Sequence, residues 1–117
     1  MKLPHGQLAI VDITKLSEYC LSTKHLRGRH KARVFASALS MNETDAAKLR
    51  DALLLAARTE EAEISASDEY GTRYIIDFVA YHKTKSAGVR SIWIIRKMKK
   101  FHASLLVTYS SNEVWNG

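Results

Sequence analysis

The hydrophobic period changes once along this chain, near residue 60, and this change constrains the fold class more than any other feature. Before it, apolar residues recur at helical spacing, as at Leu49, Leu53 and Ala56. After it, apolar and polar residues alternate with period two through β-branched and aromatic stretches such as 72–81. Because helices precede strands instead of alternating with them, we predict an α+β domain. Two or three N-terminal helices would pack on one face of a three- to four-stranded antiparallel sheet.

The predicted elements follow from capping residues, spacing and turn signals. Three helices are expected: one capped by Asp12 or Thr14 and ending near Cys20, one over His30–Leu39, and one capped by Asn42 or Thr44 and ending near Arg58. Strands are expected within 63–67, 72–81, 89–97 and 104–110, with turns at 68–71 and 83–88. Residues 1–117 then form one domain, with helices over about 12–58 and the sheet over about 61–111.

One face of the predicted sheet is expected to be partly open, because three helices cover only one side of a small sheet well. Alternation along the long strand places Tyr74, Ile76 and Phe78 on one side. The opposite, open side is expected to collect Arg73, Asp77, Ser91, Trp93, Thr108 and Ser110. A functional site is predicted there.

Composition limits the class of protein. The 117 residues carry 18 Lys and Arg against 12 Asp and Glu, a formal net charge of +6, which favours a polyanionic partner. The single cysteine, Cys20, excludes an internal disulfide framework, so we expect a reducing cytoplasmic location. The start of the chain lacks the apolar region of a secretory signal, and no stretch approaches the roughly 18 apolar residues of a membrane span. We therefore expect no membrane association.

A basic run occupies 24–33, where KHLRGRHKAR places five cations and two histidines in ten residues without a carboxylate. This composition is typical of a surface that binds nucleic-acid phosphates. A solvated positive face has the same composition, and charge alone leaves both interpretations open.

Motifs for cofactors and metals are absent from the sequence. The five histidines do not have the spacing of a metal site, and there is no glycine-rich phosphate loop, so we expect no cofactor and no metal. Metal-free acid–base chemistry remains. RNA cleavage of this kind needs a group to deprotonate the ribose 2′-OH, a group to protonate the leaving oxygen, and cations for the phosphate. The basic run contains residues suited to each of these roles, namely His25, Arg27, His30, Lys31 and Arg33.

Each candidate also has an ordinary structural interpretation. A histidine in the run can be a loop residue, and Lys31 or Arg33 a solvated helix residue. Thr108, whose hydroxyl would donate a hydrogen bond to phosphate, can be a simple strand residue, and Trp93, which would stack on a base, is more often a core residue.

Five stretches of the chain together resemble a bacterial family of small toxin-like domains, found alone and at the C-termini of polymorphic toxins and phage-related proteins. The stretches are LPHGQLAIVDITKLSEYCL, HLRGRHKARVFASALS, YGTRYIIDF, SIWII and LLVTYS. The resemblance implies a ribonuclease fold of the barnase/EndoU/colicin/RelE type, with the active site on the open face of the sheet. It singles out His25, Gly28, Lys31, Phe35, Gly71, Ser91, Trp93 and Thr108. This chain departs from the family pattern at Ser40, where glycine is usual, and at Leu105, where many members carry arginine.

The sequence and the resemblance together predict the toxin of a toxin/antitoxin pair, acting as a metal-independent endoribonuclease. The expected catalytic residues are His25, His30, Lys31, Ser91, Trp93 and Thr108. The expected phosphate-binding residues are Arg27, Arg29, Arg33 and Arg73. The expected partners are RNA and an acidic antitoxin protein. The alternative is a non-catalytic RNA-binding or protein-interaction module.

Overall fold

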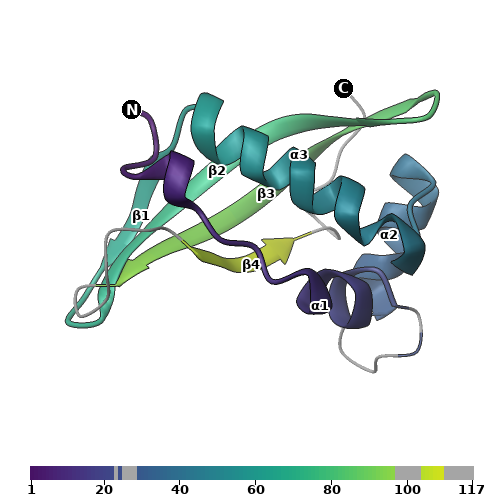
Figure 1. Cartoon of the computed structure of the whole chain (residues 1–117), viewed down its shortest axis with the longest axis horizontal. Coiled ribbons are helices and arrows are strands. Elements are labelled where there is room, and N and C mark those ends of the chain that lie inside the picture. The colour runs from purple at the N-terminus through teal and green to yellow at the C-terminus, as the bar shows by residue number, and fades with distance from the viewer. Residues whose placement is uncertain (23, 25–28, 97–103, 110–117) are drawn as a thin grey trace.

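The computed structural model describes residues 1–22, 24, 29–96 and 104–109, and of residues 19–20, 30–31 and 104–109 it describes the backbone alone. The predicted α+β class is confirmed, because the helices come first along the chain and a four-stranded antiparallel sheet follows them. Figure 1 shows a helix lying along a long, twisted sheet.

Short capped helices and two longer ones form the first half of the described chain. In chain order they are η1 (Gly6–Leu8), α1 (Ile13–Lys15) with the π-helical turn η2 (Leu16–Cys20), α2 (Arg29–Leu39), η3 (Glu43–Asp45) and α3 (Ala46–Thr59). Asp12 caps α1, since its Oδ1 accepts from the Thr14 N–H at 3.0 Å. Asn42 and Asp45 form a capping box before α3, in which each side chain accepts from the backbone near the other. The first of the two capping residues predicted for each of these helices is therefore the one used.

Helix α2 ends at a left-handed capping residue, Ser40. Ser40 has a φ of 55°, in the left-handed region that favours glycine. Its N–H donates to the Ala36 carbonyl at 3.0 Å, and the Met41 N–H donates to the Phe35 carbonyl at 3.2 Å. This is the position at which the resembled family usually has glycine.

The strands β1 (Glu63–Ser67), β2 (Gly71–His82), β3 (Lys85–Arg96) and β4 (Ser104–Tyr109) pair in chain order. All four lie within or close to the predicted stretches. The turn predicted over 83–88 is wrong in length, because His82 already pairs with Lys85 and only Lys83 and Thr84 form the loop. Strands β2 and β3 therefore form a long two-stranded ribbon that extends past β1 (Figure 1).

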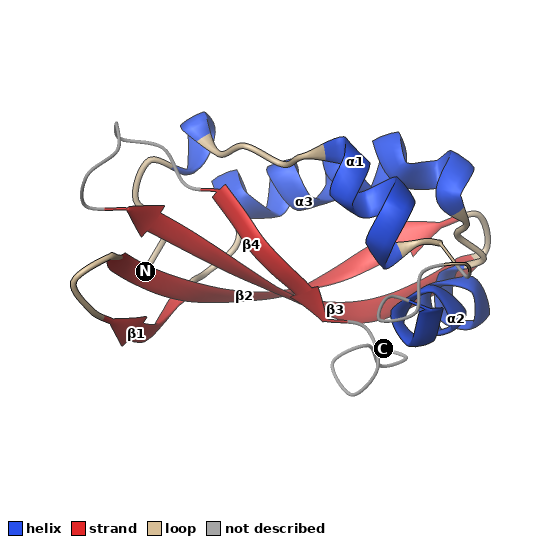
Figure 2. Ribbon diagram, turned by 90° about the horizontal axis from the view of Figure 1, so that it is seen from below, coloured by secondary structure: helices blue, strands red, loops and turns tan. Residues whose placement is uncertain are grey.

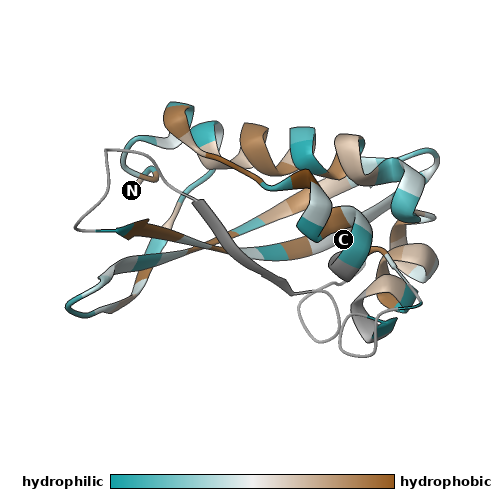
Figure 3. Cartoon of the chain, turned by 60° about the horizontal axis from the view of Figure 1, so that its bottom comes forward, coloured by the Kyte–Doolittle hydropathy of each residue, from teal (hydrophilic) through white to brown (hydrophobic). Residues whose placement is uncertain are grey.

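The core lies between the sheet and the helical segments η2, α2 and α3, which contribute buried residues such as Leu16, Phe35 and Leu53. Figure 2 shows α1 and α3 on the same side of the sheet. Brown and teal segments alternate along α3 in Figure 3, as expected of a helix with one apolar face. The buried residues of β2 are those predicted to face the helices, among them Tyr74, Ile76 and Phe78.

The predicted faces of β3 are wrong. Register places Trp93 opposite Tyr74 and Ser91 opposite Ile76, so Ser91 and Trp93 lie on the core face and both are 0% exposed. The open face instead carries Arg90, which pairs with Asp77.

Candidate nucleic-acid interface

The first half of α2 presents a basic surface to solvent. Arg29 and Arg33 are exposed and lie one helical turn apart, while Ala32 and Phe35 on the other side of the helix are buried in the core. Lys24, just before the helix, is also exposed. The first turn of α2 holds no acidic residue, so the partial positive charge of the helix N-terminus adds to the two guanidinium groups.

The opposite end of α2 is fixed to the β2–β3 hairpin. The Lys85 Nζ donates to the Ser37 carbonyl at 2.8 Å, and His82 Nδ1 lies 2.6 Å from the Leu39 carbonyl oxygen. Phe35, which the resemblance singles out, is 0% exposed and packs in the core as predicted. The helix that carries the basic surface is thus held by packing along its length and by hydrogen bonds at its C-terminal end.

Arg29, Arg33 and Lys24 differ from Arg73 and Arg90 in their neighbours. Within the described part of the chain, no carboxylate lies at ion-pair distance from any of the three. Arg73 and Arg90, in contrast, each hold a carboxylate at 2.8 Å. The cations at the start of α2 are therefore available to an external anion.

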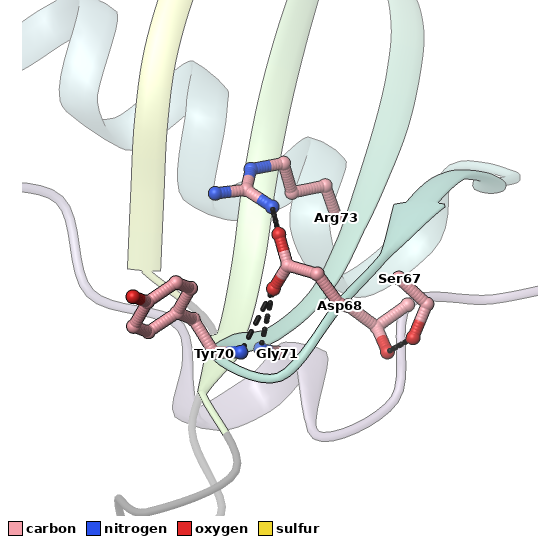
Figure 4. Close-up of polar contacts among 6 residues, drawn as sticks. Ser67, Asp68, Tyr70, Gly71 and Arg73 are labelled. Carbon is pink, nitrogen blue, oxygen red and sulfur yellow. Dashed lines mark hydrogen bonds and ion pairs between the residues drawn. The ribbon is translucent and has the colours of Figure 1, made fainter.

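Arg73, a predicted phosphate-binding residue, forms an ion pair with Asp68 of the β1–β2 turn. Its Nη1 donates to Asp68 Oδ2 at 2.8 Å, and Asp68 Oδ1 accepts from the N–H groups of Tyr70 and Gly71 at 2.8 and 3.2 Å (Figure 4). The Arg73 guanidinium, followed by the Tyr70 N–H, lowers the pKa of Asp68 below its ordinary value. The guanidinium group of Arg73 is thus engaged by a carboxylate of the same chain.

Ser91 and Trp93 form a buried hydrogen-bonded pair. The Trp93 indole Nε1 donates to Ser91 Oγ at 2.9 Å, and Ser91 Oγ donates to the Ile76 carbonyl oxygen at 3.1 Å. These bonds satisfy polar atoms that would otherwise be buried without partners. The roles predicted for Ser91 in orienting phosphate and for Trp93 in stacking on a base are contradicted, since neither side chain reaches the surface.

The remaining predicted site residues lie wholly or partly outside the described residues. This holds for His25, Arg27 and Gly28, and also for Ser110. His30 and Lys31 belong to α2, and Thr108 belongs to β4, where its backbone pairs with Ser91. Their side chains lie outside the described part of the chain, so the predicted roles of His25, His30, Lys31 and Thr108 stay predictions.

Sequence reasoning missed His82, which connects three elements. Its buried ring lies at the end of β2, against the last carbonyl of α2 and with Nε2 3.5 Å from Asp45 Oδ1 before α3. No described residue gives this Nε2 a hydrogen bond. The signal was its parity with Ala80 and Phe78, which places His82 on the core side of the strand.

Neither a metal cluster nor a membrane-spanning helix occurs among the described residues. No group of three or more His, Cys, Asp or Glu side chains there is arranged to hold a metal ion. None of the described helices is long and apolar enough to cross a membrane.

Comparison with known proteins identifies a family for this chain. No curated protein sequence and no solved structure matches the chain. A family model described as a domain of unknown function, DUF6883, matches residues 2–112, which include every helix and strand that the structure describes, and Lys24, Arg29 and Arg33 of the basic surface. The chain therefore belongs to the DUF6883 family.

Proposed function

We propose that this protein acts on RNA as a metal-independent endoribonuclease, and that it is the toxin of a toxin/antitoxin pair. The observation that carries the proposal is the pair Arg29 and Arg33, exposed one turn apart on α2 without a carboxylate neighbour among the described residues. RNA phosphates would bind there, where the guanidinium groups and the helix N-terminus act on the same anion.

The chemistry follows from the residue types next to these arginines. His25 or His30 would take the proton from a ribose 2′-OH, which attacks the adjacent phosphorus, and a second proton donor would release the 5′-oxygen. Lys31 would stabilise the negative charge that develops on the phosphorane oxygens. The products are a 2′,3′-cyclic phosphate and a free 5′-hydroxyl, and no step uses a metal ion.

The cleavage test compares wild type with Lys31→Ala in EDTA. Wild type should cut RNA, leave cyclic phosphate ends and spare DNA. Lys31→Ala should be slower by about a hundredfold, which corresponds to about 3 kcal/mol of transition-state stabilisation. Lys48→Ala, which removes an exposed lysine from α3, is the matched control and should cleave like wild type. Cleavage that disappears in EDTA and returns with Mg²⁺ would contradict the mechanism.

The toxin role has its own test. Induced expression of wild type should arrest growth, and co-expression of an acidic partner protein encoded beside it should restore growth. A net charge of +6 favours an acidic partner through electrostatic complementarity. Equal growth of cells that express wild type and cells that express Lys31→Ala would argue against a toxin that acts through this site.

A second candidate function is RNA binding without cleavage. The burial of Ser91 and Trp93 favours it, because two of the expected catalytic side chains then contribute to folding alone. Binding without any cleavage product, with a steep dependence on salt, would select this function. Replacing both Arg29 and Arg33 by alanine should lower the slope of log K against log salt by about 1.4, the value for two phosphate contacts on a single strand. Arg58→Ala, an exposed arginine of α3, should leave the slope unchanged.

A further inference from the structure

Strand β2 is much longer than the strand that pairs with it on one side. β1 covers only Thr72–Ile75 of β2, while β3 pairs with all of it from Gly71 to His82. From Ile76 onward, no described strand pairs with β2 on the β1 side. Figure 1 shows this free stretch as the part of the ribbon that extends beyond β1, with α3 beside it.

The hairpin geometry identifies which backbone groups point outward from this edge. His82 and Lys85 enclose a two-residue loop, so they form a hydrogen-bonded pair. Hydrogen bonding to β3 then alternates along β2, and the N–H and C=O groups of Asp77, Val79 and Tyr81 point away from β3. Within the described part of the chain, no backbone hydrogen bond engages these groups.

An apolar groove runs along the same edge. It has a volume of about 230 Å³ and is lined by Ala52, Leu55, Ala56, Thr59 and Glu60 on one side and residues 78–81 of β2 on the other. Three large side chains are exposed along this groove: Leu55 at 53%, Val79 at 37% and Tyr81 at 76%.

The edge also lacks the devices by which monomeric proteins prevent strand pairing. Residues 76–82 contain no proline and no lysine. The one formal charge, on Asp77, is already balanced by Arg90, whose Nε and Nη2 donate to the carboxylate at 2.8 and 3.0 Å. An unprotected edge of this kind is suited to pairing with another strand.

We propose that the partner is a second copy of this chain, and that the two β2 strands pair antiparallel about a two-fold axis at Val79. In this register Val79 lies opposite Val79 of the second copy, and Asp77 lies opposite Tyr81, whose phenol can donate to the carboxylate. All three outward-pointing residues then exchange both backbone hydrogen bonds with the second copy. The contact is isologous, so it closes as a dimer and does not propagate.

Other symmetric registers are less favourable. Centring the pair on Asp77 would place two carboxylates directly opposite each other and would bring the second copy against the first residue of β1, Glu63. Centring it on Tyr81 would place the Lys83–Thr84 loop at the contact and leave Asp77 without a partner strand. Only the register centred on Val79 uses the whole free edge.

The oligomeric state tests the proposal. Wild type should sediment at twice the mass of one chain at micromolar concentrations. Val79→Lys, which would place two ammonium groups opposite each other at the axis, should raise the dimer dissociation constant at least a hundredfold. Ile64→Lys introduces a lysine at an exposed apolar residue of β1, away from the free stretch of β2. This variant should remain dimeric. A monomeric wild type, or a dimeric Val79→Lys, would overturn the proposal.

Cysteine cross-linking tests the register and does not depend on how Val79→Lys folds. In a Cys20→Ser background, Val79→Cys should form a symmetric disulfide on mild oxidation, because facing Cα atoms in such a pair are about 5.5 Å apart. Tyr81→Cys should not, because its two copies would be roughly 13 Å apart along the strands. Cross-linking of Tyr81→Cys but not of Val79→Cys would exclude this register. If wild type is a monomer that binds an extended peptide of another protein at this edge, the partner is not a second copy and the proposal is wrong.

Discussion

His82 Nδ1 lies 2.6 Å from the carbonyl oxygen of Leu39, the residue at which α2 ends. A carbonyl oxygen only accepts, so Nδ1 carries the proton and donates. The last carbonyls of a helix have no partner within the helix, and here a side chain from the β2–β3 hairpin supplies one of the missing bonds. The histidine thereby joins the helix that carries the basic surface to the sheet.

Replacing His82 by alanine should destabilise the fold by about 2–4 kcal/mol, because the change opens a cavity and leaves the Leu39 carbonyl buried without its donor. Urea unfolding followed by circular dichroism measures this loss. Lys83→Ala, at the exposed neighbouring residue, should stay within about 0.5 kcal/mol of wild type. Equal midpoints for the two variants would show that the His82 contact contributes nothing to stability.

Ser91→Ala should lower stability by about 1–3 kcal/mol, because the buried Trp93 Nε1 loses its acceptor. Ser86→Ala, in the same strand, is the control and should change stability little. Activity on RNA, expressed per folded molecule, should be the same for Ser91→Ala and wild type. A loss of activity at unchanged melting temperature would instead return Ser91 to the site, against the burial seen here.

Ser40→Gly should stabilise the protein by about 0.5–1 kcal/mol, because Ser40 adopts a φ of 55° at which glycine meets no Cβ penalty. Ala36→Gly, at an exposed position inside the same helix, should lower stability by about 1 kcal/mol. Thermal unfolding of the two variants side by side measures both signs. Destabilisation by both would mean that the left-handed conformation of residue 40 does not carry this cost.

Short-range sequence patterns predicted the helix caps and the β1–β2 turn well, because these features form through contacts between residues close in sequence. Asp12 and Asn42 cap helices as their side chains suggest, and Asp68 and Gly71 form the turn expected between β1 and β2. Each of these features depends on hydrogen bonds between residues at most three positions apart. The sequence alone contains everything needed to predict them.

The faces of β3 were predicted wrongly because they depend on pairing with β2. A two-residue loop at Lys83–Thr84 sets the parity of the whole strand, and a loop of another length can reverse it. Arg90 has the same parity as Ile92 along the strand. A charged residue favours the solvent, so Arg90 indicates that this face of β3 is the outward one. Ser91 then had to point inward, where Trp93 and the Ile76 carbonyl satisfy its hydroxyl.

The turn between β1 and β2 should make stability depend on acid through Asp68. Hydrogen bonds from Arg73 and then Tyr70 lower the pKa of this carboxyl below its ordinary value in the folded protein. A carboxyl with a lowered folded pKa stabilises the fold above its unfolded pKa, and the contribution is lost as the pH falls through the folded value. The melting temperature of wild type should therefore exceed that of Asp68→Asn by a constant amount above about pH 5, and the two should converge towards pH 2.

Glu69→Gln removes the same charge from the same exposed turn without breaking these hydrogen bonds, and its melting temperature should follow that of wild type across the range. A difference between wild type and Asp68→Asn that persists unchanged at pH 2 would show that the charge on Asp68 does not stabilise the turn.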